Sequence, residues 1–123
     1  MQLIGKVRLG KKTKDLVKEL IAGEIAVIAH QDIDQLAAQD LIDTNIKAII
    51  NAKQSISGKY PNLGPNKLLA TGIPIIDEVG MDIFNKLDNE NKIIICDNKI
   101  IKSGQVIAKG NILTEDLVRD KLT

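Results

Sequence analysis

Three short, nearly uninterrupted apolar runs constrain the fold of this 123-residue chain more than any other feature. They are EIAVIAH (residues 24–30), IKAIINA (residues 46–52) and GIPIIDEVG (residues 72–80). Runs of this length that are rich in Ile and Val are typical of strands buried on both faces, as in a parallel sheet covered by helices. Helical spacing of apolar residues between the first two runs predicts a parallel βαβ unit. We therefore expect an α/β fold whose central sheet is mostly parallel.

The segments around the first run predict further elements. Residues 2–9 alternate moderately between polar and apolar side chains, which is typical of a strand. Thr13 is placed to cap a short helix over residues 14–21. Asp32 or Asp34 can cap the helix that follows the first buried run, because short polar side chains accept hydrogen bonds from free backbone N–H groups there.

The C-terminal half adds short helices and hairpins. Helical signals occur near residues 65–71 and over residues 80–87. Turn residues at 97–98 (Asp-Asn) and 103–104 (Ser-Gly) predict β-hairpins. Thr114 caps a last helix that reaches the chain end without a clear C-terminal cap. That uncapped helix indicates the N-terminal module of a longer protein.

Composition excludes several classes of function. The chain has 17 basic and 16 acidic residues, a net charge of +1 and 2% aromatic residues, so nucleic-acid binding is not expected. Hydrophobic residues reach 44%, yet no run approaches the roughly 20 apolar residues that cross a bilayer. The lone cysteine, Cys96, lies in an apolar run, which indicates a reducing compartment. We expect one cytoplasmic domain over residues 1–123, without metal or direct membrane contact.

The most unusual stretch is SISGKYPNLGP (residues 55–65), which follows a buried strand and precedes a helix. In open α/β sheets, ligands bind beyond the carboxyl ends of the strands. Glycines permit close backbone approach, and the hydroxyl, lysine and amide groups suit a phosphate or a carboxylate. The candidate ligand-binding residues of this loop are Ser55, Ser57, Gly58, Lys59, Tyr60, Asn62 and Gly64. The alternative is a rigid, proline-pinned turn with solvated polar groups.

Polar residues next to neighbouring strands complete the candidate site. His30 and Asp32 end the first buried run and Asp77 lies in the third, so we expect them along one rim with the loop. His30 could act as a general base, or it could brace the loop while a nearby aspartate caps a helix. Arg8 could reach the same anion, whereas residues 11–14 are interpreted as a solvated turn. No nucleophile–base pair is established, so no catalytic residue is assigned.

Several of these segments resemble the N-terminal region of SteA-type bacterial proteins. These proteins are described as cytokinetic-ring proteins and are often labelled thiamine pyrophosphokinase-like. The matching segments are Gly5-x-x-Arg8, Thr13-Lys14-x-Leu16, residues 23–34, residues 55–65 and residues 72–74. The chain departs from that family at Lys59, where Arg is usual, and after Arg8, where an acidic residue is often found. The resemblance implies a longer protein, with a kinase-like domain and a membrane anchor beyond this module.

A second resemblance concerns the fold. The order of apolar strand, AIIN, serine-rich loop, helix, GIPIID, short helix and hairpin is similar to the swivelling phosphohistidine domain of phosphoenolpyruvate-utilising enzymes. The loop over residues 55–65 holds no histidine, so the phosphocarrier itself is missing. This resemblance implies a swivelling β/β/α-type domain with a mostly parallel sheet and C-terminal β-hairpins.

Three functions are open at this point. The first is a small-anion-binding or regulatory and assembly module of a SteA-like, cell-division-associated protein. The second is part of a thiamine pyrophosphokinase-like phosphotransferase whose catalysis lies in a C-terminal domain, so that this chain alone is not an enzyme. The third is a protein-interaction scaffold. The expected partners are a small anionic or phosphorylated ligand, the C-terminal domain of the same protein and, as an alternative, a second copy; no cofactor is identified.

Overall fold

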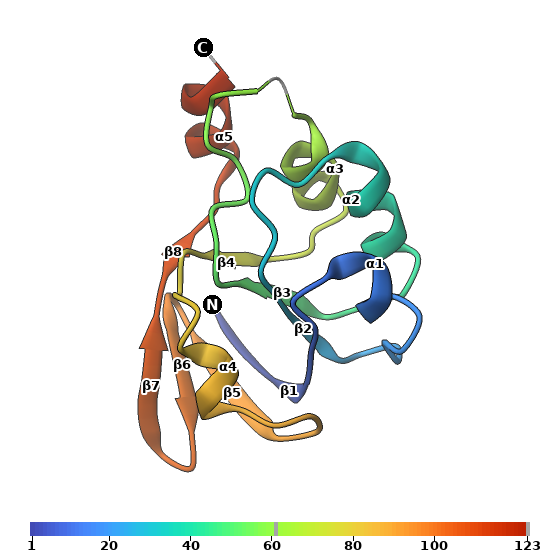
Figure 1. Cartoon of the computed structure of the whole chain (residues 1–123). Coiled ribbons are helices and arrows are strands. Elements are labelled where there is room, and N and C mark those ends of the chain that lie inside the picture. Colours follow the sequence, from blue (N-terminus) through green and yellow to red (C-terminus); the bar gives the residue numbers. More distant parts are fainter. Residues whose placement is uncertain (61, 123) are drawn as a thin grey trace.

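Residues 1–60 and 62–122 are described by a computed structural model and form an eight-stranded sheet flanked by five helices (Figure 1). The strand order is β7-β6-β5-β1-β2-β3-β4-β8. The strands are β1 (Gln2–Leu9), β2 (Ile25–Ile28), β3 (Ala48–Asn51), β4 (Ile75–Asp77), β5 (Lys92–Cys96), β6 (Lys99–Lys102), β7 (Gln105–Lys109) and β8 (Asn111–Ile112). The helices are α1 (Thr13–Leu16), α2 (Gln35–Ile42), α3 (Gly64–Ala70), α4 (Ile83–Lys86) and α5 (Glu115–Leu122).

The centre of the sheet is parallel, which confirms the α/β prediction. Strands β1, β2, β3 and β4 pair in parallel, with Ile25 opposite Ala48 and Ile50 opposite Ile76. The predicted C-terminal hairpins β5–β6 and β6–β7 are also confirmed, since both pairs are antiparallel. Asp97 adopts a φ of 54° in the first turn, where a short polar side chain tolerates the left-handed conformation.

Two antiparallel pairings were not predicted. Strand β1 pairs with β5 through its first half, with Gln2 opposite Cys96, before its second half pairs with β2. At the far edge the short strand β8 pairs with β4, with Ile76 opposite Ile112. Local sequence patterns identify a strand but not its partner, and a strand of two residues gives too short a pattern to recognise.

The helix caps show one correction. Helix α1 spans four residues instead of the predicted 14–21. Its N-cap is Lys12 without a side-chain hydrogen bond, so the prediction that Thr13 caps it was wrong. The Thr13 hydroxyl instead lies 2.8 Å from His30 Nδ1. The other two predicted caps are present, because Asp34 accepts from Ala37 N–H and Thr114 accepts from Leu117 N–H.

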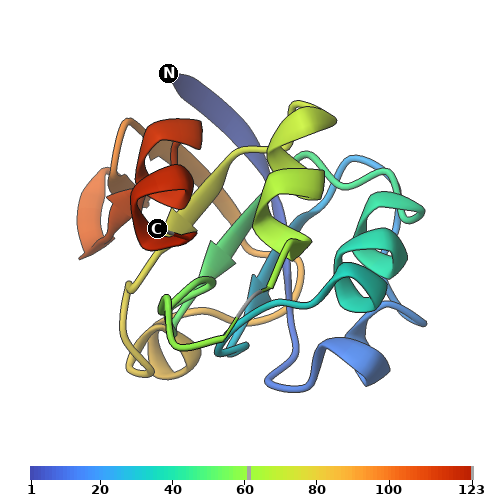
Figure 2. The same ribbon diagram turned by 90° about the horizontal axis from the view of Figure 1, so that it is seen from above.

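Apolar side chains pack against both faces of the sheet. Figure 2 shows helices α1, α2 and α3 next to one another along one side of the sheet. On one face Ile28 and Ile49 pack with residues of α1, α2, α3 and α5. On the other face Val27 and Ile50 pack with Ile83 of α4 and with the hairpin strands. Among the described residues the buried hydrophobic side chains are Ile, Leu, Val and Ala, as the composition predicted. None of the helices in residues 1–60 and 62–122 is long and apolar enough to span a bilayer.

Candidate functional site

The buried side-chain amide of Asn51 links the carboxyl ends of β2 and β3, and Ser55 extends this network to β4. Asn51, at the end of β3, is fully buried, and its Oδ1 accepts from His30 N–H at 3.0 Å and from Lys53 N–H at 3.0 Å. Its Nδ2 donates to the His30 carbonyl at 2.9 Å and to Ser55 Oγ at 2.7 Å. The side chain of Asn51 therefore satisfies backbone groups that the sheet leaves unpaired where its strands end.

Ser55 continues this network to β4. Its N–H donates to Asp77 Oδ2 at 2.8 Å and its hydroxyl donates to Asp77 Oδ1 at 2.5 Å. Burial raises the pKa of Asp77 to about 6, although the hydrogen bonds from Ser55 act in the opposite direction. The carboxylate of Glu78 raises this pKa further, while Lys121 of α5 lowers it. Asp77 is thus a buried carboxyl group that titrates close to neutral pH.

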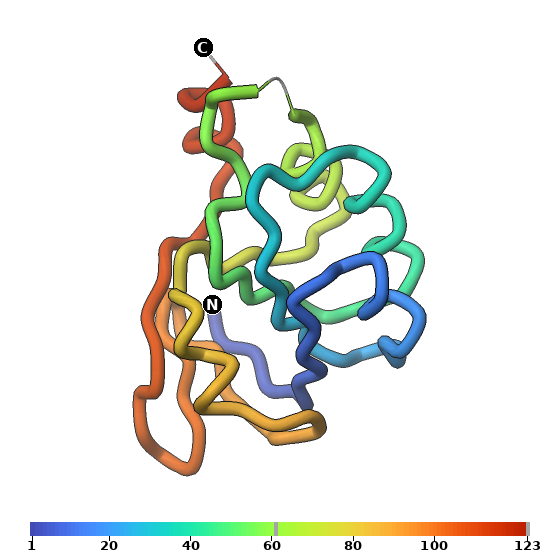
Figure 3. The backbone as a smooth tube through the Cα atoms, in the orientation of Figure 1, coloured from blue at the N-terminus to red at the C-terminus, as the bar shows by residue number. Residues whose placement is uncertain are grey.

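The loops that follow β2 and β3 run side by side (Figure 3). Ile33 N–H donates to the carbonyl of Ser55 at 2.9 Å. The carboxylate of Asp32 accepts from the N–H of Ser57 at 2.7 Å and from its hydroxyl at 2.9 Å. Asn62 Nδ2 donates to the carbonyls of Ile33 and Ser55. These polar groups hold the two loops together.

The two glycines of the loop also serve packing. A Cβ on Gly64 would collide with the carbonyl oxygens of Ile33 and Asp34. Gly58 has a φ of +83°, and a Cβ there would lie 2.8 Å from the carbonyl oxygen of Lys121. Both positions therefore require glycine, because a side chain at either would collide with a neighbouring backbone.

The tip of the loop is different, because two described residues there carry exposed side chains. Lys59 is exposed, and Tyr60 is 64% exposed. Pro61, also part of the predicted loop, lies outside the described residues. Of the loop residues with polar side chains, Lys59 and Tyr60 are therefore the two that present them outward. Ser55 and Asn62 are buried, and Ser57 is half-buried and hydrogen-bonded to Asp32.

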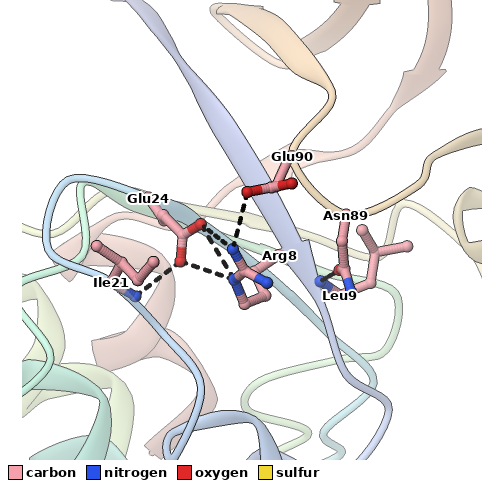
Figure 4. A network of polar contacts seen from close by, with 6 residues as sticks. All are labelled: Arg8, Leu9, Ile21, Glu24, Asn89 and Glu90. Carbon is pink, nitrogen blue, oxygen red and sulfur yellow. Dashed lines mark hydrogen bonds and ion pairs between the residues drawn. The ribbon is translucent and has the colours of Figure 1, made fainter.

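Arg8 lies apart from this rim. It forms a bidentate pair with Glu24, from Nε to Oε1 at 3.0 Å and from Nη2 to Oε2 at 2.9 Å, and it lies 3.8 Å from Glu90 (Figure 4). Glu24 precedes β2, whereas His30 follows it, so Arg8 is at the opposite end of that strand. Burial alone would raise the pKa of Glu24, but the hydrogen bonds from Arg8 and from Ile21 N–H lower it. Arg8 thus joins β1 to the start of β2 and is not available to an anion at the rim.

His30 faces a hollow that lies between α1 and α2, with a volume of about 590 Å³. We call it the lysine hollow. One side is formed by residues 11–14, which include Lys11, Lys12 and Lys14. The base is formed by residues 29–31 and the other side by Asp34, Leu36, Ala37 and Asp40 of the α2 segment. The basic cluster that the sequence indicated as a solvated turn therefore borders a concave surface.

Burial lowers the pKa of His30, and the carboxylates of Asp34 and Asp32 oppose that shift only in part. The imidazole is therefore neutral at neutral pH, with one ring nitrogen protonated. When the Thr13 hydroxyl donates to Nδ1, the proton resides on Nε2, for which no hydrogen-bond partner is found among the described residues. That nitrogen can then donate to a ligand.

A second hollow of about 420 Å³ lies on the other side of the network, beneath α5. Its lining includes Asp77, Glu78 and Lys121, together with the amide side chains of Asn98 and Asn111. Glu78 Oε2 already accepts from Asn111 Nδ2 at 3.0 Å. Its two carboxylates make this hollow unfavourable for an anion. Within residues 1–60 and 62–122 no group of three or more His, Cys, Asp or Glu side chains could hold a metal ion.

Comparison with known proteins gives a fold but no family. No protein-family model and no curated protein sequence matches the chain. Among solved structures, the chain is similar to the crystal structure of 3-isopropylmalate dehydratase (leuD) from Methanocaldococcus jannaschii, with a TM-score of 0.61 and 12% sequence identity. The match covers 99% of this chain and 88% of that chain. At this identity the likeness shows a shared fold alone.

The family expected from the sequence motifs is corrected by this finding. The structure that shares the fold is a 3-isopropylmalate dehydratase, and neither a SteA-type nor a thiamine pyrophosphokinase-like protein is matched. A role as a cytokinetic-ring or cell-division protein, which rested on that resemblance, is therefore not supported. The motifs did not identify the family because they include residues that hold loops together in this fold, namely Ser55, Asp32 and Gly64. Residues with this packing role do not identify a function.

Proposed function

We propose that this chain is a binding module for a small anion and that the anion binds in the lysine hollow beside His30. The observation that carries the proposal is that Lys12, Lys14 and His30 line one hollow at the carboxyl ends of parallel strands. Ligand sites in open α/β sheets favour this edge of the sheet. His30 belongs to the site expected from the sequence, while the lysines replace the buried loop residues as anion contacts.

The charges of the lining are balanced in number, because Lys12 and Lys14 face Asp34 and Asp40 while Lys11 Nζ lies over the ring of Phe84, 5.6 Å from its centroid. Asp34 already accepts a hydrogen bond from Ala37 N–H at the start of α2, so its carboxylate is partly engaged. When the Thr13 hydroxyl donates to Nδ1, the neutral imidazole of His30 offers Nε2–H as a hydrogen-bond donor without further protonation. An anion in the hollow would then gain ion pairs from Lys12 and Lys14 and one hydrogen bond from His30.

The finer assignments from the sequence belong to this proposal. We assign the domain to the swivelling β/β/α class, supported by the parallel centre of the sheet and the hairpins β5–β6 and β6–β7. We place it in the cytoplasm and treat the chain as one regulatory domain that passes ligand binding on to another domain or partner. A second candidate function, a protein-contact scaffold, is supported by the exposure of Tyr60 (64%) and Leu63 (44%) near the loop tip.

Calorimetric titration with inorganic phosphate tests the anion site. Changing Lys12 and Lys14 together to glutamine is expected to weaken phosphate binding about tenfold, because two exposed ion pairs contribute up to about 1 kcal/mol each. The matched control is Lys59→Gln, which removes an exposed lysine from the loop tip and should leave the affinity within about twofold.

If phosphate affinity falls in Lys59→Gln but not in the variant with Lys12 and Lys14 changed to glutamine, the anion site lies at the loop over residues 55–65. Absence of binding by phosphate, sulfate and a set of small carboxylates would reject the anion module and leave the scaffold. The set includes 3-isopropylmalate, the compound that appears in the name of the structurally similar dehydratase. A pull-down that depends on Tyr60 would then support the scaffold.

A further inference from the structure

The two sides of the lysine hollow differ in chemistry. Lys12 and Lys14 line the α1 side. The facing side carries Leu36 and Ala37 on the first turn of α2, and Ala29 contributes to the base. Leu36 is 74% exposed, the highest value among the large hydrophobic side chains of the described residues. The hollow is therefore basic on one side, while the facing side combines these aliphatic side chains with the carboxylates of Asp34 and Asp40.

Inorganic phosphate would use only one of these sides. A single exposed leucine on a surface needs no explanation, but this one forms the wall of a concave site together with two alanines. The volume of about 590 Å³ lies within the range of sites that hold whole organic molecules. An aliphatic group lying on Leu36 and Ala37 would remove apolar surface from water on both partners.

We infer that the lysine hollow takes an organic anion with a short aliphatic body, an inference that rests on the proposed function. The anionic group pairs with Lys12 and Lys14 and accepts a hydrogen bond from His30 Nε2. The body lies against Leu36, Ala37 and Ala29. Asp40, on the aliphatic side, disfavours a second anionic group there, so the far end of the body is uncharged.

Calorimetric titration of the full chain with inorganic phosphate, with butyl phosphate and with the same ester bearing a terminal carboxylate tests this inference. Burial of one methylene strengthens binding about fourfold, so partial cover of the butyl chain is expected to give about tenfold tighter binding than phosphate. The terminal carboxylate should remove that gain. Leu36→Ser is expected to bring butyl phosphate within about twofold of phosphate while phosphate affinity is unchanged.

Leu117→Ser, which alters an exposed leucine of α5 at the other hollow, is the matched control and should keep the tenfold preference. Equal affinities of phosphate and butyl phosphate in the unchanged chain would overturn the inference while leaving the proposed anion module intact. A preference that survives Leu36→Ser would also overturn it, because the body would then lie elsewhere. Absence of binding by every probe would overturn the proposed function itself.

Discussion

Replacing Asn51 with alanine is expected to lower the free energy of unfolding by about 4 kcal/mol. The amide makes hydrogen bonds to the N–H and carbonyl of His30, to Lys53 N–H and to Ser55 Oγ. Removing it leaves these groups without their partner at a fully buried position, and each unpaired buried group costs about 1–3 kcal/mol. Urea unfolding followed by far-ultraviolet circular dichroism measures the change.

Asn66→Ala serves as the control, because that asparagine is exposed on α3. Surface substitutions of this kind change stability by less than about 0.5 kcal/mol. An Asn51→Ala variant that loses less than about 1 kcal/mol would mean that water or a rearranged loop satisfies these groups. The account of Asn51 as the residue that joins the ends of β2 and β3 would then be incorrect.

Asp77→Asn is expected to stabilise the protein by about 3 kcal/mol at pH 7 and to have almost no effect at pH 4. The pKa of the buried carboxyl is about 6 in the folded state, whereas an aspartate in the unfolded chain has its ordinary value of 3.8. As the pH rises through this interval, the unfolded chain releases the proton first, so the wild-type protein loses stability between about pH 4 and pH 6. Each pKa unit of difference between the folded and the unfolded state corresponds to about 1.4 kcal/mol of stability. The amide of the variant does not titrate and avoids this loss.

Chemical denaturation of both proteins at intervals from pH 4 to pH 7 gives the difference between the two stability profiles. Subtracting the profiles removes the contributions of other groups, such as Glu24, that both proteins share. Asp88→Asn, at an exposed position, should follow the wild-type profile throughout. Parallel profiles for the wild type and Asp77→Asn would show that burial does not perturb this carboxyl group.

The strands and most helices could be predicted because their signals are local. Runs such as AVI and AII are apolar at successive positions, which suits strands covered on both faces, and all residues of β2 and β3 are indeed buried. Asp34 caps the start of α2, and Asp97 lies in the turn after β5. Both are short polar side chains directly next to the element in the sequence, so they could be recognised locally. The pairing of β1 with β5 could not be predicted, because it joins segments about ninety residues apart.

The site could be predicted in part. The topology rule for parallel strands placed His30, Ser55 and Asp77 at one edge, and the structure joins them through Asn51, whose role the sequence does not reveal. From the sequence alone, Arg8 could reach the same anion. Its partner is Glu24, and only the parallel register of β1 and β2 brings these two residues together.

The ring of His30 gives the most direct test of the anion site, because the chain holds one histidine and its proton NMR signal is unambiguous. In the free protein, burial lowers the pKa of His30. An anion bound in the lysine hollow stabilises the imidazolium form, so saturating phosphate is expected to raise this pKa, and the rise should need about tenfold more phosphate when Lys12 and Lys14 are both glutamine. An unchanged pKa of His30 in the presence of phosphate that binds the protein would contradict the location of the site.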